Sequence, residues 1–365
     1  SSGVVTIPSG NVISIANEIT GSVSLILENN ASLVQTNPNA VNTATITVKR
    51  NTTPIVHDDF TYWSSPTTGS QTLRTFSPTT QSDKFFTYLN DWAYLNPTVQ
   101  TFDKGIGYAI RAEYGDVTPV VRPHEFTGVP NNGTINVPVT VRTSNPDIGI
   151  GEILAGNPYP STLDADAFID ANLVGTGTIN QTISGTLYFW THNHSITGYD
   201  YDGNDYATYT KLGGAAAGPG PSGSGNTNPP TRYIASGQGF FVDYETDGNI
   251  TFNNAMRLGT DNTNFYKTSN SKTAKTSAVE SHRIWLNLTN STANFSQALV
   301  GYVTDATNDY DPGFDGRSYG GAHDIYSVLD AEILTIQSRA LPFVNTDFII
   351  IGYNVTVAGT TTIKI

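Results

Sequence analysis

The sequence predicts an all-β protein, and three observations lead to that prediction. Short runs rich in Val, Ile, Thr and Tyr alternate in hydrophobicity, as strands with one buried face do. Gly, Asn and Pro separate these runs at the positions expected for turns. Leucine-rich segments with the helical period of about 3.6 residues are missing. The 365 residues are enough for roughly two or three domains.

Composition and charge exclude several functions. The net charge is −13 and basic residues are scattered, so neither nucleic-acid binding nor docking on an anionic membrane is expected. The chain contains no cysteine and one methionine, which rules out disulfides and thiolate chemistry and suits an extracellular location. No apolar run is long enough for a transmembrane segment. The chain starts abruptly at Ser1 in β-type sequence, as a processed or trimmed chain would.

Residues 1–50 contain short apolar runs that recur about every ten residues. This spacing fits either a small β-solenoid or a meander. The segment Leu27–Leu33 has the pattern of a turn between rungs with a buried Asn. We therefore expect a short solenoid-like stack at the N-terminus.

Residues 51–152 and 153–258 form two β-rich blocks that resemble distorted copies of each other. In both blocks an aromatic segment is followed by Gly-x-Gly and an apolar strand, so that Gly105 and Gly107 match Gly237 and Gly239. A phosphate loop would need a third glycine and a following helix, so a bulge or a close backbone approach is the better interpretation. We expect the blocks to have related folds.

One short helix is predicted, over residues 162–170. Pro158 and Pro160 prevent a central strand from running through the preceding segment. The pattern then changes to that of a helix with Asp164 and Asp166 in its first turn. These aspartates are interpreted as helix N-terminal charges, because no His or Glu nearby would complete a metal or catalytic site.

The remaining segments complete the predicted domain organisation. Residues 213–231 are rich in Gly, Pro, Ser and Ala, which predicts an exposed, flexible loop. Residues 259–281 are rich in Thr, Asn, Ser and Lys and are expected to be an interdomain linker. Residues 282–365 alternate in hydrophobicity at regular spacing, which predicts a separate Ig-like β-sandwich domain.

Two acidic loops are candidate calcium sites, because calcium prefers oxygen ligands. Neither loop has the EF-hand spacing, and an ordinary acidic turn is the alternative for both. Their candidate ligands are Asp305, Asn308, Asp309, Asp311 and Asp315 in one loop and Asp200, Asp202, Asn204 and Asp205 in the other. His192 and His194 could reach one zinc ion from the same side of a strand, but no third ligand is evident.

Aromatic residues set among Asn, Asp and Gly are candidates for a sugar-stacking or adhesive face. They are Trp92, Tyr94, Tyr199, Tyr201, Tyr206 and Tyr209. No catalytic residues are predicted, because the sequence contains no nucleophile elbow and no His-Glu-x-x-His motif. A glycoside hydrolase would need two facing carboxylates, and Glu152 and Asp243 have no obvious partner in the sequence.

A series of motifs follows one order along nearly the whole chain. It comprises Leu27–Leu33, Val48–Asn51, Tyr62–Pro66, Phe126–Gly133, Gly156–Phe168, Gly185–His192, Ile234–Phe241, Arg283–Asn290 and Leu299–Tyr302. This series resembles the C-terminal region of large cell-surface proteins of Bacteroidetes, especially flavobacteria, that the type IX secretion system exports. The resemblance implies secretion, surface display and an adhesive or gliding-related role, and it supplies no catalytic residues. The family's sorting domain is missing here, and similar sequence continues past Ile365 in relatives, so the last domain is expected to be incomplete.

The sequence therefore predicts an extracellular or cell-surface structural or adhesive protein without enzymatic activity. Its expected partners are extracellular polymers, including glycans, and calcium is the one candidate cofactor. The alternative is a carbohydrate-binding accessory region of a secreted polysaccharide-degrading enzyme. Homo-association is expected through exposed β-edges at Val4–Ile7 and at the terminal strand Thr360–Ile365.

Overall fold

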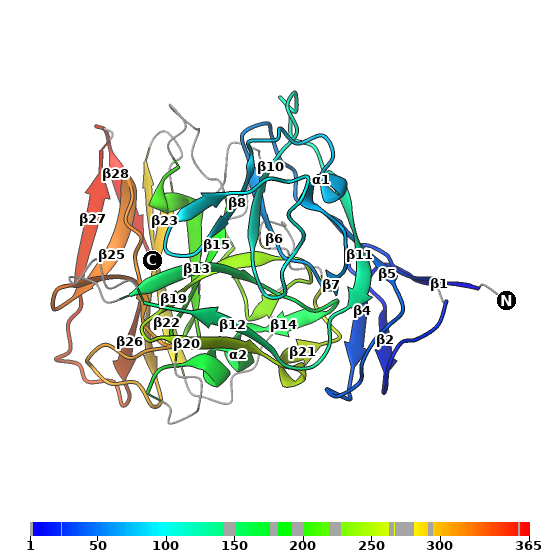
Figure 1. The fold of residues 1–365 in the computed structure, drawn as a ribbon. Coiled ribbons are helices and arrows are strands. Elements are labelled where there is room, and N and C mark those ends of the chain that lie inside the picture. Colours follow the sequence, from blue (N-terminus) through cyan, green and yellow to red (C-terminus); the bar gives the residue numbers. More distant parts are fainter. Residues whose placement is uncertain are drawn as a thin grey trace. The chain divides into compact units, whose positions relative to one another are not determined.

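The computed structural model describes residues 3–22, 24–141, 150–175, 182–191, 201–218, 228–262, 266, 281–290, 295–356 and 358–365. The described chain is all-β (Figure 1), as predicted. It divides into two compact units. Unit 1 comprises Ser1–Ile183 and Tyr233–Tyr266, and unit 2 comprises Ser184–Arg232 and Lys267–Ile365. None of the helices in the described ranges has the length and hydrophobicity needed to cross a membrane.

The N-terminal segment of unit 1 is a β-solenoid, which confirms the prediction and excludes a meander. Its strands are β1 (Val4–Ile7), β2 (Val12–Ile15), β3 (Ser24–Leu27), β4 (Ser32–Gln35) and β5 (Ile46–Asn51). Strands β1, β3 and β5 pair in parallel, and so do β2 and β4. Val4 pairs with Ser24 and Val12 with Ser32, an advance of 20 positions, and Leu25 pairs with Ile46, an advance of 21. The ten-residue spacing of the sequence thus corresponds to two strands per rung.

The turn between the two strands of a rung repeats with the same period. Gly10 has φ 74° and Asn30 has φ 70°, a backbone conformation that Gly and Asn tolerate best. Asn30 is half-buried rather than buried as predicted, and its side-chain oxygen accepts a hydrogen bond from the buried Arg50 guanidinium at 3.0 Å. The Asn side chain therefore both forms the turn and pairs with a buried cation.

The first block of unit 1 contains a four-stranded sheet that covers the main hydrophobic core. Its strand order is β6 (Phe60–Trp63), β10 (Tyr108–Arg111), β8 (Phe85–Tyr88) and β9 (Trp92–Tyr94). One face of this sheet places Trp63, Tyr108 and Phe85 in the core, together with apolar residues of the solenoid. Strand β11 (Pro123–Pro130) joins solenoid strand β5 to β7 (Thr67–Thr68), and α1 (Leu73–Phe76) is a short helix that the sequence analysis missed.

The pairing pattern of the second block repeats that of the first. Strand β13 (Gly151–Gly156) pairs antiparallel with β19 (Gly239–Tyr244), as β6 does with β10. Strand β15 (Ile183–Trp190) pairs antiparallel with β16 (Tyr206–Thr210), as β8 does with β9. Unit 1 also contains the pair β12 (Ile135–Val139) with β20 (Gly248–Phe252), and β14 (Thr162–Asp164) between β18 (Tyr233–Ile234) and β21 (Arg257–Leu258).

The matched glycines connect the two blocks reciprocally, and their geometry supports the predicted duplication. Gly105 and Gly237 both have positive φ, 77° and 82°. The Gly107 N–H donates to Leu154 O at 2.8 Å, and the Ser64 N–H donates to Gly237 O at 2.9 Å. Each Gly-x-Gly thus contacts the first strand of the other block, which confirms a close backbone approach rather than a phosphate loop.

The predicted helix begins three residues later than expected, because Thr162–Asp164 form strand β14. Helix α2 spans Ala165–Asn172. Asp164 is its N-cap, and the Asp164 carboxylate accepts hydrogen bonds from the N–H groups of Asp166 (3.1 Å) and Ala167 (3.5 Å). The interpretation of Asp164 as a charge at the helix N-terminus is therefore correct, although the predicted start of the helix was wrong.

Unit 2 is built around one seven-stranded sheet with the order β27-β25-β26-β23-β22-β28, in which β24 also pairs with β26. The strands are β22 (Ser281–Asn290), β23 (Phe295–Val303), β24 (Gly316–Arg317), β25 (His323–Leu329), β26 (Glu332–Ala340), β27 (Ile350–Val355) and β28 (Thr361–Lys364). The pairing of β25 with β26 ends at Ser327, and beyond it Ile325 packs on Leu288 and Ala298. The predicted sandwich is thus one sheet that folds over its own core, not two separate sheets.

The structure divides the chain differently from the predicted domains. Residues 213–215 form strand β17 (Gly213–Ala215) instead of a loop, and Ala216 and Ala217 are buried. Leu212 and Ala215 pack against Leu299 of β23 in one core. This apolar contact places residues 184–232 in the same unit as the C-terminal strands. Of the predicted flexible loop, 219–227 lie outside the described residues.

The start of the predicted linker belongs to unit 1. Asn262 is buried, and its side chain donates to Ala31 O at 2.6 Å and accepts from the Ser236 N–H at 2.8 Å. Residues 259–262 are therefore packed rather than extended between domains. Residues 263–265 and 267–280 of the predicted linker lie outside the described residues.

Candidate functional site

An aromatic strip lies on the face of the β6-β10-β8-β9 sheet opposite the main core. Three segments of aromatic-x-aromatic sequence supply it, because alternate strand residues point to the same side. Ala109 lies between them on β10, and its small side chain leaves room for the rings. The aromatic strip consists of Phe60, Tyr62, Phe86, Tyr88, Trp92 and Tyr94, with Phe241 of β19 packed against it.

Trp92 and Tyr94 are the exposed members of the aromatic strip, at 45% and 56% exposure. The Trp92 ring is held edge-on by Tyr88 (centroids 5.1 Å apart) and by Phe241 (5.8 Å). The Tyr94 hydroxyl donates to Ser82 O at 3.1 Å. Both rings are therefore supported from below, so a ligand that stacks on them finds surfaces already in place.

The prediction singled out Trp92 and Tyr94 but missed the rest of the aromatic strip. The signal was available in the sequence as the repeated pattern Phe60-Thr61-Tyr62, Phe86-Thr87-Tyr88 and Trp92-Ala93-Tyr94. What the sequence does not contain is the strand order that places these three segments in one sheet.

Two carboxyl groups face each other next to the aromatic strip. Glu152 of β13 is the direct cross-strand partner of Asp243 of β19. The Tyr88 hydroxyl donates to the Glu152 carboxyl, which links the pair to the Trp92 ring. Burial, followed by the negative charge of Asp243, raises the pKa of Glu152 to about 8, so this carboxyl holds a proton at neutral pH. The expectation that Glu152 and Asp243 lack a partner was wrong, because the register of β13 on β19 pairs them.

Unit 2 contains a second group of aromatic rings on β15 and β16. Tyr188 stacks on Tyr319 at 4.0 Å, and Tyr206 packs edge-on against Tyr319 at 5.0 Å. Trp190 contacts both Tyr201 and Tyr206. The structure thus brings together two of the predicted stacking residues, Tyr201 and Tyr206.

The two other predicted stacking residues of this region do not contribute to the ring group. Tyr209 is only 5% exposed and cannot offer its ring to a ligand. Tyr199 lies outside the described residues. Among the described residues, the strip in unit 1 therefore offers the more exposed aromatic surface.

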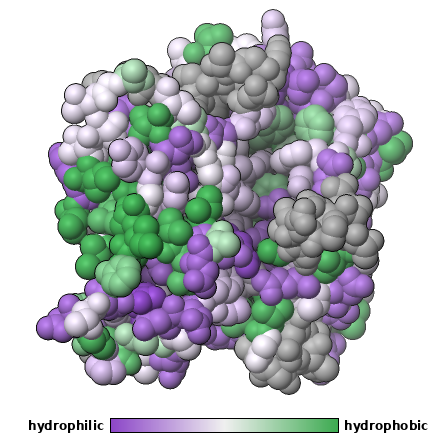
Figure 2. Space-filling view, turned by 90° about the vertical axis from the view of Figure 1, so that its left-hand side faces the viewer, coloured by the Kyte–Doolittle hydropathy of each residue, from purple (hydrophilic) through white to green (hydrophobic). Residues whose placement is uncertain are grey.

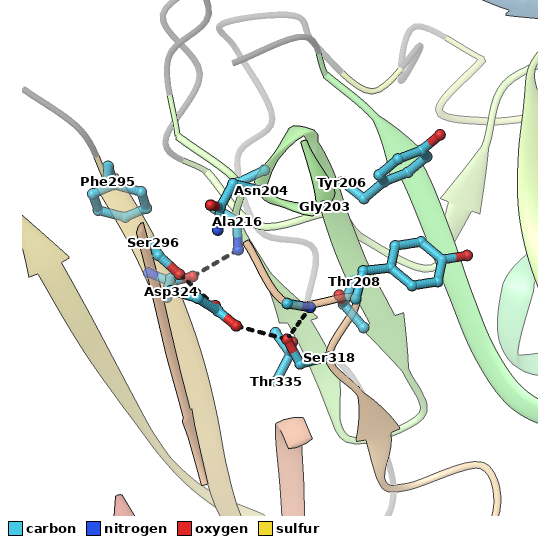
Figure 3. Close-up of a pocket in the computed structure, with 14 residues that line it drawn as sticks. Gly203, Asn204, Tyr206, Thr208, Ala216, Phe295, Ser296, Ser318, Asp324 and Thr335 are labelled. Atoms are coloured by element: carbon cyan, nitrogen blue, oxygen red, sulfur yellow. Dashed lines mark hydrogen bonds between the residues drawn. The ribbon is translucent and has the colours of Figure 1, made fainter. Parts of the chain in front are cut away.

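A small polar pocket of unit 2 lies beside Tyr206 and Tyr319 (Figure 3). Its volume of about 20 Å³ has room for roughly one water molecule. The Asp324 carboxylate at its base accepts hydrogen bonds from the hydroxyls of Ser296 (3.1 Å) and Ser318 (2.8 Å). Burial raises the pKa of Asp324. The pocket is a satisfied hydrogen-bond cluster too small for a sugar ring.

Comparison with known protein families places the whole chain in one of them. The model of a domain of unknown function, DUF8693, matches residues 1–365. The chain belongs to this family. No curated protein and no solved structure gives a significant match. The function of this DUF8693 chain therefore has to be argued from its geometry.

In this DUF8693 chain, the described part of this acidic loop, residues 201–205, stabilises local backbone structure. Asp202 accepts from the Asn204 N–H and, with its other oxygen, from the Ala322 N–H, both at 3.0 Å. Asn204 accepts from the His323 N–H at 3.0 Å, and Asp205 completes a capping box with Asp202. Asp200 lies outside the described residues, as do His192 and His194.

The acidic loop 305–315 is also tied to backbone and hydroxyl donors. Asp315 accepts from the Asp311 N–H at 2.7 Å and from the Ser338 hydroxyl at 2.9 Å, and burial raises its pKa to about 6. Asp311 accepts from the Thr307 hydroxyl at 3.0 Å. The Asn308 backbone carbonyl accepts a hydrogen bond from the Arg339 guanidinium, and the Asp309 N–H donates to the Thr307 hydroxyl. Asp305 lies in the left-handed backbone region, with φ 72°. In the part of the chain that the structure describes, no group of three or more His, Asp or Glu is placed to hold a metal ion.

Calcium binding by the 305–315 loop is a prediction that thermal unfolding tests. Because the Asp311 and Asp315 oxygens already accept hydrogen bonds, we expect the melting temperature to be the same with calcium and with a chelator. A ligand that binds only the native state would raise the melting temperature by mass action. A melting temperature that falls with chelator and recovers with calcium would contradict this expectation and establish a calcium site.

Proposed function

We propose that this chain is an extracellular, cell-surface adhesive protein that binds glycans through its aromatic strip and catalyses no reaction. The observation that supports this function best is the presence of two exposed rings, Trp92 and Tyr94, on one face of a sheet with rings packed beneath them. The apolar face of a sugar ring stacks on such a surface, while its hydroxyls remain available to water and to neighbouring polar groups.

Charge also favours a neutral polymer as the ligand. The net charge of −13 repels anionic polymers at long range, and charged residues make up only 13% of the chain. Export by the type IX secretion system and display at the surface are proposed from the resemblance of the motif series, which includes Tyr62–Pro66 at the edge of the aromatic strip.

The second candidate function is that of a carbohydrate-binding accessory region of a secreted polysaccharide-degrading enzyme. A defined aromatic platform is the feature that favours it, because such regions anchor an enzyme on one polymer. Binding confined to one polysaccharide backbone would favour the accessory role. Binding to several surface glycans would favour adhesion.

A glycan array with variants tests the proposal. We expect the wild-type chain to bind neutral glycans and Trp92→Ala to weaken that binding about ten-fold, because one stacking surface is lost. The matched control is Tyr114→Ala, since Tyr114 is an exposed aromatic residue outside the aromatic strip. Absence of any glycan ligand, or equal binding by Trp92→Ala and the wild type, would contradict the proposal. Turnover of a glycan that is lost in Glu152→Gln would show an enzyme instead.

A further inference from the structure

Strand β27 of unit 2 is an outer strand whose described pairing is with β25 alone. Exposed apolar side chains occur both on β27 and on the segment just before it, residues 343–348. Figure 2 shows hydrophobic residues gathered on one face of the molecule. We call the exposed apolar group around this strand the β27 patch, which consists of Phe343, Val344, Phe348, Ile350 and Tyr353.

The segment before β27 is held in a fixed conformation. The Arg339 guanidinium forms an ion pair with Asp347, with Nε and Oδ2 3.0 Å apart. The Tyr302 hydroxyl donates to the same Oδ2 atom at 2.9 Å, and its ring packs edge-on against Phe343 at 5.1 Å. These contacts order the segment before any partner arrives, so a partner would lose little entropy in binding the β27 patch.

The free edge of β27 carries none of the usual protection against pairing. Residues 348–356 contain no charged side chain and no proline, whereas edge strands are commonly blocked by Lys, Pro or bulges. The opposite edge of the same sheet, β28, does carry Lys364. In a two-fold dimer each edge residue lies opposite its own copy or a near neighbour, so a charged side chain on the edge would face a like charge. An edge without charged side chains avoids this repulsion, which matters in a chain of net charge −13.

The backbone of β27 offers a regular row of free-edge groups. The Thr356 N–H donates inward, to Ala322 O at 3.0 Å. Because donors alternate sides along an antiparallel strand, the N–H groups of Ile351, Tyr353 and Val355 face the open edge. A two-fold axis at Tyr353 would pair Tyr353 with its copy and Ile351 with Val355 of the second chain.

The size of the β27 patch fits a dimer interface. Phe348 is 78% exposed and Tyr353 61% exposed. The patch as a whole offers roughly 500 Å² of apolar side-chain surface, so two copies would bury at most about 1,000 Å² of it before backbone groups are counted. That upper limit reaches the lower bound for specific interfaces.

We propose that strand β27 pairs antiparallel with β27 of a second copy of this chain, which joins the two unit 2 sheets across a two-fold axis with Tyr353 at its centre. The dimer would carry two aromatic strips, and two linked binding sites raise avidity for a repeating polymer. The pairing itself does not depend on glycan binding, and it can be tested without any ligand.

A single introduced cysteine tests the geometry directly, because the chain has no cysteine of its own. In the proposed pairing the two Tyr353 Cα atoms lie about 5.5 Å apart, which a disulfide can span. We expect Tyr353→Cys to form a disulfide-linked dimer under mild oxidation. The matched control is Val117→Cys, at an exposed position of unit 1, and it should remain largely monomeric. Equal cross-linking of both variants, or none at Tyr353→Cys, would overturn the proposal.

Light scattering of the full chain over a range of concentrations provides the second test. We expect the wild type to dimerise, and Tyr353→Lys and Phe348→Ser each to weaken dimerisation at least ten-fold, with Val117→Lys unchanged. Two variants are needed so that a folding defect in one leaves the other to decide. A wild type that stays monomeric at all concentrations would overturn the proposal. So would a dimer that survives both changes and is lost only when residues 1–8, which contain edge strand β1, are removed.

Discussion

Gly107→Ala is expected to lower the free energy of unfolding by about 3 kcal/mol, because the added methyl group overpacks a rigid site. A Cβ at Gly107 would lie 2.6 Å from the Ala155 carbonyl oxygen and 2.6 Å from Leu154 Cγ. The first contact is with backbone, which cannot move aside as the end of a side chain can. The Gly107 N–H also bonds to Leu154 O, so the two strands would have to separate.

Alanine substitutions at two other glycines serve as comparisons, and urea unfolding measures the stability of each variant. At Gly69 in the same block the nearest atom to an added Cβ is 3.5 Å away, so Gly69→Ala is expected to change stability by less than about 0.5 kcal/mol. At the related position Gly239 the nearest atom is 3.0 Å away, so Gly239→Ala should have an intermediate effect. A Gly107→Ala variant as stable as Gly69→Ala would show that the two blocks do not approach each other as described.

Glu152→Gln is expected to remove most of a pH dependence of stability between about pH 5 and 8. Burial and the Asp243 charge raise the pKa of Glu152 from its ordinary 4.5 to about 8 in the folded chain. Below pH 4.5 the carboxyl is protonated in both states. As the pH rises toward 8, the unfolded chain releases this proton while the folded chain retains it, so wild-type stability falls, by about 2 kcal/mol after allowance for solvent screening.

Chemical denaturation at a series of pH values measures this effect. Glutamine is neutral and has the shape of the protonated glutamate, so the variant should be at least as stable as the wild type at pH 8 and similar to it at pH 4. Asp243→Asn removes the facing charge and should flatten the profile in part. Parallel profiles for the wild type and Glu152→Gln would contradict the raised pKa.

The features that the sequence predicted correctly are those that repeat along the chain. The recurrence of apolar runs in residues 1–50 predicted the solenoid, because each rung uses the same turn at Gly10 and Asn30. The two Gly-x-Gly segments predicted the duplication for a similar reason, since close backbone approach requires glycine at both Gly107 and Gly239. Local rules of this kind can be recognised in a single sequence.

The features that were missed depend on contacts between distant segments. Glu152 and Asp243 become a pair only through the register of β13 on β19, which no local pattern encodes. The Ala215–Ala217 run was interpreted as part of a loop because the segment is rich in Gly, Pro, Ser and Ala, yet all three alanines are buried and Ala215 packs with Leu212 and Leu299. For the acidic loops the sequence left calcium binding and an ordinary acidic turn open, because it does not show the N–H and hydroxyl donors that Asp202 and Asp315 meet; calcium binding stays a prediction.

The quenching of tryptophan fluorescence tests glycan binding by the aromatic strip most directly. Of the four tryptophans, Trp63 and Trp190 are buried and Trp285 is half-buried, so Trp92 is the one most accessible to a soluble quencher. We expect a bound glycan to protect the wild-type chain from acrylamide quenching. In Trp92→Phe that protection should vanish, while calorimetry still detects binding because a phenyl ring still stacks. A glycan that binds the wild type and leaves its quenching unchanged would contradict the proposal.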